Sequence, residues 1–210
     1  MVAWARDLRV SASGSRTRRE FVMSALLKPF SDQIGPTLLK QDAIGIGPIL
    51  PQDVGLMFTW MNDVEANSFD LPHRPTDGNA FTAWITMLAA DPTKIFFTIR
   101  AAGRSEAIGF VFLQNLHLVN RAADLGIRIG HERDRGHGFG KATVRLALAY
   151  AWDHLNLARV QLRVMADNER AVRAYTSCGF ETEGRHRNAV FINGRWHDML
   201  TMAALNFPVP

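Results

Sequence analysis

The sequence predicts a mixed α/β (α+β) fold, in which helices cover a sheet whose strands run in both directions. Two apolar segments, residues 94–100 and 107–113, flank a short turn and predict an antiparallel hairpin. The second half of the chain alternates strands with helices in the order β-α-β-α-β-β. A meandering first half joined to such a second half favours a sheet of mixed direction over a doubly wound parallel sheet.

The first half of the chain is expected to contain four strands and two helices. Apolar residues at helical spacing after Pro51 predict a helix over residues 53–62. The polar, proline-bearing residues 63–79 predict a long loop, of the kind that often shapes a substrate site. The remaining elements expected here are strands at residues 44–50, 94–100, 107–113 and 123–130 and a helix at residues 80–90.

Local sequence patterns predict the strands, helices and turns of the second half of the chain more clearly. Strict alternation of apolar and polar residues predicts a strand at residues 158–165. Asn168 can cap a helix at residues 169–177, which Gly179 ends. The dipeptide Asn193-Gly194 predicts a two-residue hairpin turn. The other expected elements are a helix at residues 140–154, a strand beginning at residues 180–182, and hairpin strands at residues 188–192 and 195–205.

Composition favours one globular domain behind an N-terminal extension. The chain has 210 residues, of which 47% are hydrophobic and 21% charged, and a net charge of +4, which suits a single domain over residues 34–210. Residues 1–33 are rich in Ser and Arg, which predicts a flexible extension. A single cysteine precludes an internal disulfide and suits a reducing cytoplasm. No apolar run approaches the roughly twenty residues of a membrane helix, so a cytoplasmic protein is expected.

A glycine-rich turn after the strand expected at residues 123–130 is the strongest chemical signal. Arg135, Gly136, Gly138 and Gly140 form the pattern R-G-x-G-x-G, and Lys141 opens the next helix. Alternate glycines let the backbone adopt positive φ and approach a ligand closely. The first N–H groups of a helix attract phosphate. The pattern therefore predicts a phosphate site, although a tight turn without a ligand has the same pattern.

Two familiar phosphate-binding motifs do not fit this turn. A Walker A loop requires Ser or Thr directly after the G-K pair, where Ala142 stands. A Rossmann fingerprint requires an acidic residue about twenty positions further on. The charged residues in that region, residues 158–163, are Arg159 and Arg163. P-loop nucleotide binding and dinucleotide binding are therefore poor interpretations.

With a second motif downstream, the chain resembles the GNAT superfamily of acyl-CoA-dependent N-acetyltransferases, and within it the RimJ/RimL-type branch. The family combines (Q or R)-G-x-G-x-(G or A) with a later N-x-x-A-x-x-x-(Y or F)-x-x-x-G-F. Both parts occur here, at residues 135–140 and 168–180. Residues 125–130 and 191–198 match as well, and the resemblance covers residues 40–207.

The resemblance implies a GNAT-like sheet, mostly antiparallel, with helices on both faces and a V-shaped splay between its two central strands. It implies acetyl-CoA as co-substrate and no metal, with the pyrophosphate at the glycine turn and the pantetheine arm in the splay. Asn168 would reach the pantetheine, and the small Ala171 would leave room for it. The implied cofactor-binding residues are Ile127, Arg128, Ile129, Arg135, Gly136, His137, Gly138, Phe139, Gly140, Lys141, Asn168, Ala171 and Tyr175.

The resemblance also implies catalytic roles. Tyr175 lies seven residues after Asn168, which is about two helical turns, so both are on one side of a helix. Its phenol is implied to protonate the departing CoA thiolate. Asp124 is the candidate general base, with Glu65 and His117 as alternatives, and each is also a typical solvated or capping residue. Cys178 is not expected to act as a nucleophile, because direct attack needs no covalent intermediate.

The implied activity is acetyl transfer from acetyl-CoA to a primary amine. The expected acceptor loops, residues 65–79 and 117–122, hold few acids, namely Glu65, Asp70 and Asp77. This favours a protein or peptide N-terminal α-amine over a strongly cationic acceptor. Small-molecule amines (polyamines, amino sugars, aminoglycosides) and a non-catalytic CoA-binding module stay open. Nucleic acid is disfavoured because the arginines of the extension are not interleaved with aromatic residues. Membrane partners are not expected, and a homodimer is left open.

Overall fold

A computed structural model describes residues 37–63 and 75–207 of the chain. Within these residues the sheet has eight strands in the order β1-β2-β3-β4-β5-β6-β8-β7. Every neighbouring pair is antiparallel except β5 and β6, which are parallel, so the predicted mixed, mostly antiparallel sheet is confirmed. The strands are β1 (Leu39–Gln41), β2 (Ile44–Gly47), β3 (Ile95–Ala101), β4 (Ala107–His117), β5 (Ala122–Ile129), β6 (Arg159–Met165), β7 (Glu181–Ile192) and β8 (Arg195–Leu205).

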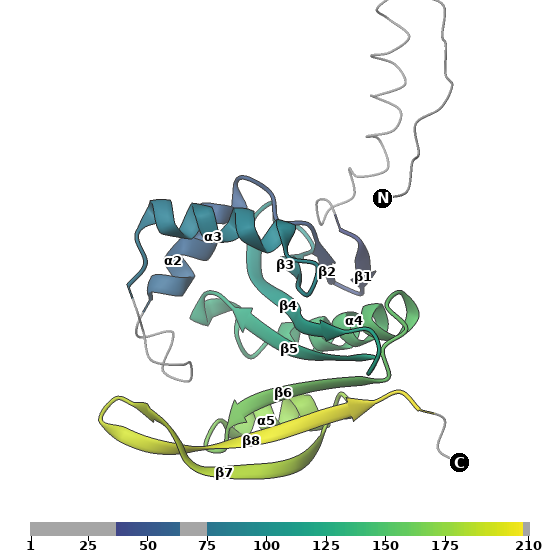
Figure 1. Cartoon of the computed structure of the whole chain (residues 1–210). Coiled ribbons are helices and arrows are strands. Elements are labelled where there is room, and N and C mark those ends of the chain that lie inside the picture. Colours follow the sequence, from purple (N-terminus) through teal and green to yellow (C-terminus); the bar gives the residue numbers. More distant parts are fainter. Residues whose placement is uncertain (1–36, 64–74, 208–210) are drawn as a thin grey trace, which may run out of the picture. The chain divides into compact units, whose positions relative to one another are not determined.

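Helices cover both faces of the sheet, as the resemblance implied (Figure 1). Apolar residues of α4 and α5 join the core cluster on one face, whereas those of α2 and α3 join a second cluster on the other. We call these the α4 face and the α2/α3 face. The helices are α2 (Asp53–Asn62), α3 (Gly78–Ala90), α4 (Phe139–Asp153) and α5 (Glu169–Thr176), with a short 3₁₀ turn, η2 (Glu132–Asp134).

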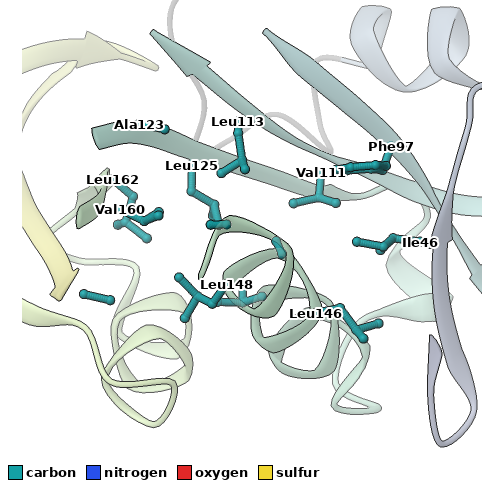
Figure 2. Packing of buried hydrophobic residues seen from close by; sticks show 14 of the residues in the cluster. Ile46, Phe97, Val111, Leu113, Ala123, Leu125, Leu146, Leu148, Val160 and Leu162 are labelled. Atoms are coloured by element: carbon teal, nitrogen blue, oxygen red, sulfur yellow. The ribbon is translucent and has the colours of Figure 1, made fainter. Parts of the chain in front are cut away.

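The main core lies between the sheet and α4. One apolar stripe of α4 is buried at Val144, Ala147, Leu148 and Ala151. Apolar side chains of five strands point towards this helix in Figure 2, among them Ile46, Phe97, Leu113, Leu125 and Leu162. Each fully buried side chain of this size stabilises the fold by about 1.5–3 kcal/mol. Strands β5 and β6 therefore both pack against α4.

The α2/α3 face carries a smaller aromatic core and a buried ion pair. Trp60 and Phe81 pack there with Phe110 of β4. Arg100 of β3 binds both oxygens of Asp53, the first residue of α2, at 2.6 and 3.2 Å, and both side chains are almost completely buried. The ion pair therefore ties the start of α2 to the sheet.

Several element boundaries differ from those expected. Strand β1 was not predicted; it pairs with β2 through a turn in which Asp42 has a φ of +53°. The strand expected at residues 44–50 ends at Gly47, because Pro48 cannot donate a ladder hydrogen bond. The segments expected at residues 180–182 and 188–192 belong to the one strand β7, which stays paired with β8 across two irregularities. Helix α3 begins earlier than predicted because Asp77 caps it.

Some expectations lie outside the described residues. They are the extension at residues 1–33, most of the loop expected at residues 63–79, and with it Glu65 and Asp70. In the part of the chain that is described, no helix is long and apolar enough to cross a bilayer.

Candidate active site at the strand splay

The candidate site begins where β5 and β6 separate. Their parallel pairing is confined to three positions, and its last pair joins Asp124 to Gln161. Beyond this pair β5 continues to bond β4, and β6 continues to bond β8, but the two strands are not paired with each other. They diverge towards their C-terminal ends (Figure 1). The implied V-shaped splay is therefore present, and it leaves two strand edges whose backbone groups need other partners.

Side chains close the narrow end of the splay. Gln161 donates through Nε2 to Oδ1 of Asp124 at 2.7 Å. Asn115 donates through Nδ2 to the other carboxylate oxygen at 2.6 Å. Asn115 reaches this position because β4 has an irregularity there, with a φ of +53° at Asn115. Both oxygens of Asp124 thus accept from neutral amides of the flanking strands.

The glycine turn lies at the open end of the splay. Gly136 and Gly138 have φ values of +83° and +81°, a backbone conformation that side-chain-bearing residues rarely adopt. A Cβ on either residue would meet no atom within 4 Å, so the turn borders open space. Gly138 is the N-cap of α4, whose first N–H groups have no intrahelical partners. The turn therefore fits an anionic group approaching the helix N-terminus.

Contacts with the sheet anchor the turn. Asp134 is buried in η2 and forms an ion pair with Arg104 of the β3–β4 turn. The second carboxylate oxygen of Asp134 is buried without a hydrogen-bond partner among the described residues. Arg135 folds back and donates to the carbonyl oxygens of Ile129 and Gly130 at 3.4 and 3.3 Å. These contacts set the position of the glycines against the end of β5.

Arg128 gives the site positive charge on the α2/α3 face. Its guanidinium donates to the carbonyl oxygen of Trp60 and lies 6.0 Å from the ring centre of Phe110. Burial, followed by the positive charge of Arg135, lowers the pKa of Arg128 to about 10, while Asp63 acts in the opposite direction. The side chain therefore stays cationic at neutral pH.

Tyr175 and Asn168 lie on α5 as predicted. Asn168 is the N-cap and its side-chain oxygen accepts from the N–H of Ala171 at 3.2 Å. The Tyr175 side chain packs against the α4-face core, with its ring centre 5.8 Å from that of Phe180. Burial, and secondarily the nearby Cys178, raises the pKa of Tyr175 to about 12, although part of the side chain remains exposed. The phenol is therefore protonated at neutral pH.

Tyr175 and Asp124 lie on opposite faces of the sheet. Ala123 and Leu125 are buried in the α4-face core, and successive side chains of a strand alternate between faces. Asp124 therefore points to the α2/α3 face, together with Gly126 and Arg128. The two candidate catalytic groups can meet only across the splay itself.

The other candidate bases are placed less favourably. His117 accepts the N–H of Asn120 at 3.0 Å within the β4–β5 turn, and Glu65 lies outside the described residues. Cys178 is half-buried; its thiol contacts the carbonyl oxygen of Lys141 at 3.6 Å, and burial raises its pKa. A neutral thiol in such a position is a poor nucleophile.

Sequence reasoning missed several residues that shape the site. Asn115 and Gln161 belong to no recognisable motif, and no local pattern predicts that they would meet Asp124. His197 pairs with Asp167 at 2.7 Å rather than with its neighbour Asp198. Asp198 instead accepts from Arg185 and from the N–H of Asn188, which supports an irregular part of β7. Only the tertiary structure brings these partners together.

The fold and the splay now define the class of protein. Residues 44–181, more than half of the chain, match the family model described as an acetyltransferase (GNAT) domain. The protein therefore belongs to the GNAT acetyltransferase family, in its RimJ/RimL-like branch.

Individual relatives agree with this assignment. The spermidine N(1)-acetyltransferase of Vibrio cholerae is 38% identical over 98 residues, which cover 47% of this chain and 56% of that protein. The putative ribosomal N-acetyltransferase YdaF of Bacillus subtilis is 34% identical over 97 residues, covering 46% and 52%. The chain thus spans little more than half the length of these relatives. The crystal structure of spermidine N-acetyltransferase from Vibrio cholerae in complex with CoA and spermine has a TM-score of 0.73 at 26% identity, covering 79% of this chain and 96% of that one.

Proposed function

We propose that the protein transfers the acetyl group of acetyl-CoA to a primary amine by direct attack of the neutral amine on the thioester. One observation carries the proposal: β5 and β6 stop pairing after Asp124 and Gln161, beside a turn with two left-handed glycines. Unpaired strand edges suit an extended arm that contains amides. A helix N-terminus suits a diphosphate. CoA contains both parts in one molecule, and its acetyl thioester supplies the acyl group.

The cofactor-binding residues follow from these two surfaces. The backbone N–H groups of residues 136–141 would hold the diphosphate, and Arg128 and Arg135 would add positive charge. The edge of β5 at Ile127 and Ile129 would bond the pantetheine arm. Since the Asn168 oxygen already caps α5, only its amide nitrogen remains to contact the arm. Ala171 and the neighbouring Tyr175 side chain would border the reacting end.

Tyr175 is the proposed general acid. Departure of CoA leaves a thiolate, and a neutral phenol can give that sulfur a proton. The raised pKa keeps Tyr175 protonated throughout the neutral range. Among the described residues, no hydrogen bond of the Tyr175 hydroxyl competes with this role.

Asp124 is the proposed general base, acting directly or through a water molecule. An acceptor amine enters as an ammonium and must lose a proton before it can attack. Asp124 lies at the apex of the splay on the face opposite Tyr175. An amine approaching from the α2/α3 face would therefore meet the base first and find the acid beyond the thioester. Two amide donors orient the carboxylate, as a positioned base requires.

For the acceptor we propose a protein or peptide N-terminal α-amine. Arg128 points to the same face of the sheet as Asp124, and its positive charge disfavours a polycation there. The second candidate is a small polyamine, because the V. cholerae relative is named for spermidine. Glu65 and Asp70, in the part of the chain not described, could serve that alternative.

Release of CoA thiol, measured over a panel of peptides, polyamines and aminoglycosides, tests the activity. We expect turnover with at least one primary amine and mass addition of a single acetyl group to it. Titration calorimetry with acetyl-CoA provides the control, because a non-catalytic module would bind acetyl-CoA without turning over any acceptor.

A further inference from the structure

Arg163 is a cation at the splay that neither the fold nor the proposed chemistry uses. It lies on β6 two residues past Gln161, where pairing with β5 has ended, and its β8 partner is Thr201. Leu162 and Val164, its neighbours, are buried in the α4-face core, so Arg163 points to the α2/α3 face. Its side chain is exposed and has no hydrogen-bond or ion-pair partner among the described residues.

The Phe112 ring covers the position that lies across the splay from Arg163. Continuing the β5–β6 register past its last pair would set Gly126 across from Arg163. Gly126 has no side chain, and a Cβ there would come within 2.1 Å of the Phe112 ring. The gap at this level is therefore bordered by an aromatic ring on one side and a guanidinium on the other.

The nearby acids bind partners other than Arg163. The two oxygens of Asp124 accept from the side-chain amides of Asn115 and Gln161. Glu183 is held by Arg159, whose Nη1 donates to Oε1 at 2.8 Å. Across the splay, Arg128 adds a second cation, whose pKa is raised by the charge of Asp63. Two guanidinium groups, those of Arg128 and Arg163, therefore lie on the same face of the sheet as the candidate base.

From this arrangement we propose that the acceptor carries a carboxylate close to its reacting amine, and that Arg163 binds that carboxylate and sets acceptor specificity. A guanidinium presents a planar fork of donors that matches the two oxygens of a carboxylate. The carboxylate could be the α-carboxylate of a free amino acid or the side chain of an acidic residue next to a peptide N-terminus. This inference rests on the proposed acetyltransferase function.

Matched acceptors test the inference on the full chain. Thiol release is measured with phenylalanine against phenylalaninamide, and with two short peptides that differ only in Asp or Asn at the second position. The four-way comparison distinguishes a free amino acid from an acidic peptide. In the wild type we expect the carboxylate-bearing member of one pair to have the higher kcat/KM at a pH where both amines are largely deprotonated.

We call the kcat/KM of the carboxylate-bearing acceptor divided by that of its neutral counterpart the carboxylate ratio. The variant Arg163→Gln should reduce this ratio by about tenfold or more, since a charged hydrogen bond of typical strength is lost. Arg163→Lys should retain part of the preference, because it keeps the charge but not the fork. Arg195→Gln, which removes another exposed arginine near the tip of the β7–β8 hairpin, is the matched control and should leave the ratio unchanged.

An unaltered ratio in Arg163→Gln, or faster acetylation of spermidine than of either carboxylate-bearing acceptor, overturns the inference while leaving the acetyltransferase function intact. Binding of acetyl-CoA with no thiol release on any acceptor overturns the proposed function itself. Thermal unfolding of each variant verifies that the exposed substitutions leave the fold unchanged.

Discussion

The side-chain amide of Gln161 donates to the carboxylate of Asp124 over 2.7 Å at the last position where β5 and β6 are paired. This contact joins the two strands immediately before they separate. The residue that we propose as general base is therefore also one of the residues that hold the two strands together at the apex of the splay. Any experiment on Asp124 has to separate these two roles.

Replacement of Asp124 by Asn keeps a side chain of the same shape but removes the base. We expect kcat/KM to fall by about 10²–10⁴-fold. Gln161→Leu, which removes the hydrogen bond but spares the carboxylate, is the control; it should cost about 1 kcal/mol of stability and keep most of the activity. Equal losses of activity in the two variants would assign Asp124 a structural role only.

Removal of the Tyr175 hydroxyl should impair chemistry rather than binding. For Tyr175→Phe we expect kcat to fall by about 10²-fold or more, with the affinity for acetyl-CoA unchanged because the ring still packs against Phe180. Tyr150→Phe is the matched control, since Tyr150 lies on α4 and packs against Phe97. Full activity in Tyr175→Phe would remove the phenol from the mechanism.

The ionisation of Tyr175 can be followed directly. The chain has two tyrosines, so the difference in phenolate absorbance between wild type and Tyr175→Phe reports one group. Its midpoint should lie near pH 12, above the ordinary value of 10.0, because burial disfavours the phenolate. Since folding raises this pKa, the stabilisation is complete below the unfolded value and is lost as pH rises towards the folded value. The wild type should therefore lose stability between these values more steeply than the variant does.

The glycine turn should tolerate little change. Gly138→Val forces a β-branched residue to a φ of +81°, which costs about 1–2 kcal/mol and displaces the first N–H groups of α4. We expect the affinity for CoA, measured by calorimetry, to fall by at least about tenfold, the equivalent of 1.4 kcal/mol. Gly55→Ala in the exposed part of α2 is the control and should leave affinity unchanged. Undiminished CoA binding in Gly138→Val would argue against the phosphate site.

The buried ion pair of Asp53 and Arg100 predicts that removing one of the two charges destabilises the fold more than removing both. Asp53→Ala leaves an uncompensated guanidinium in the core, and the free energy of unfolding should drop by about 3–5 kcal/mol. Joint replacement by Leu at position 53 and Met at position 100 should be much less costly, because both charges are removed. Lys94→Met, which breaks the partly exposed pair with Asp91, should have little effect. A double variant as unstable as Asp53→Ala would show that the geometry of the pair, not charge compensation, is what the fold requires.

Local sequence patterns predicted most elements because short-range sterics determine them. The alternation in β6, the helical spacing in α2 and the Asn168 cap all depend on residues within a few positions of one another. Strand β1 was not predicted because it is short and has no apolar alternation. The continuity of β7 was missed because its middle is irregular and is sustained by Asp198 of the neighbouring strand.

The candidate site could be predicted only in part. The glycine turn and Tyr175 belong to contiguous motifs, so the sequence alone identifies their residues. The hydrogen bonds from Asn115 and Gln161 to Asp124 could not be predicted in this way, because the three residues come from separate strands. The same holds for Arg163, which has the pattern of an ordinary exposed strand residue.

By itself, the sequence determined the left-handed turn at Gly136 and Gly138, the helix that follows it, and the position of Tyr175 on α5, since these depend on backbone sterics and helical period. Only the tertiary structure decided which strand edges stay unpaired, and that Asp124 and Tyr175 face opposite sides of the sheet. Strand order and register arise from contacts between residues far apart in the chain. No local pattern encodes them, and they place the glycine-rich turn beside two unpaired strand edges.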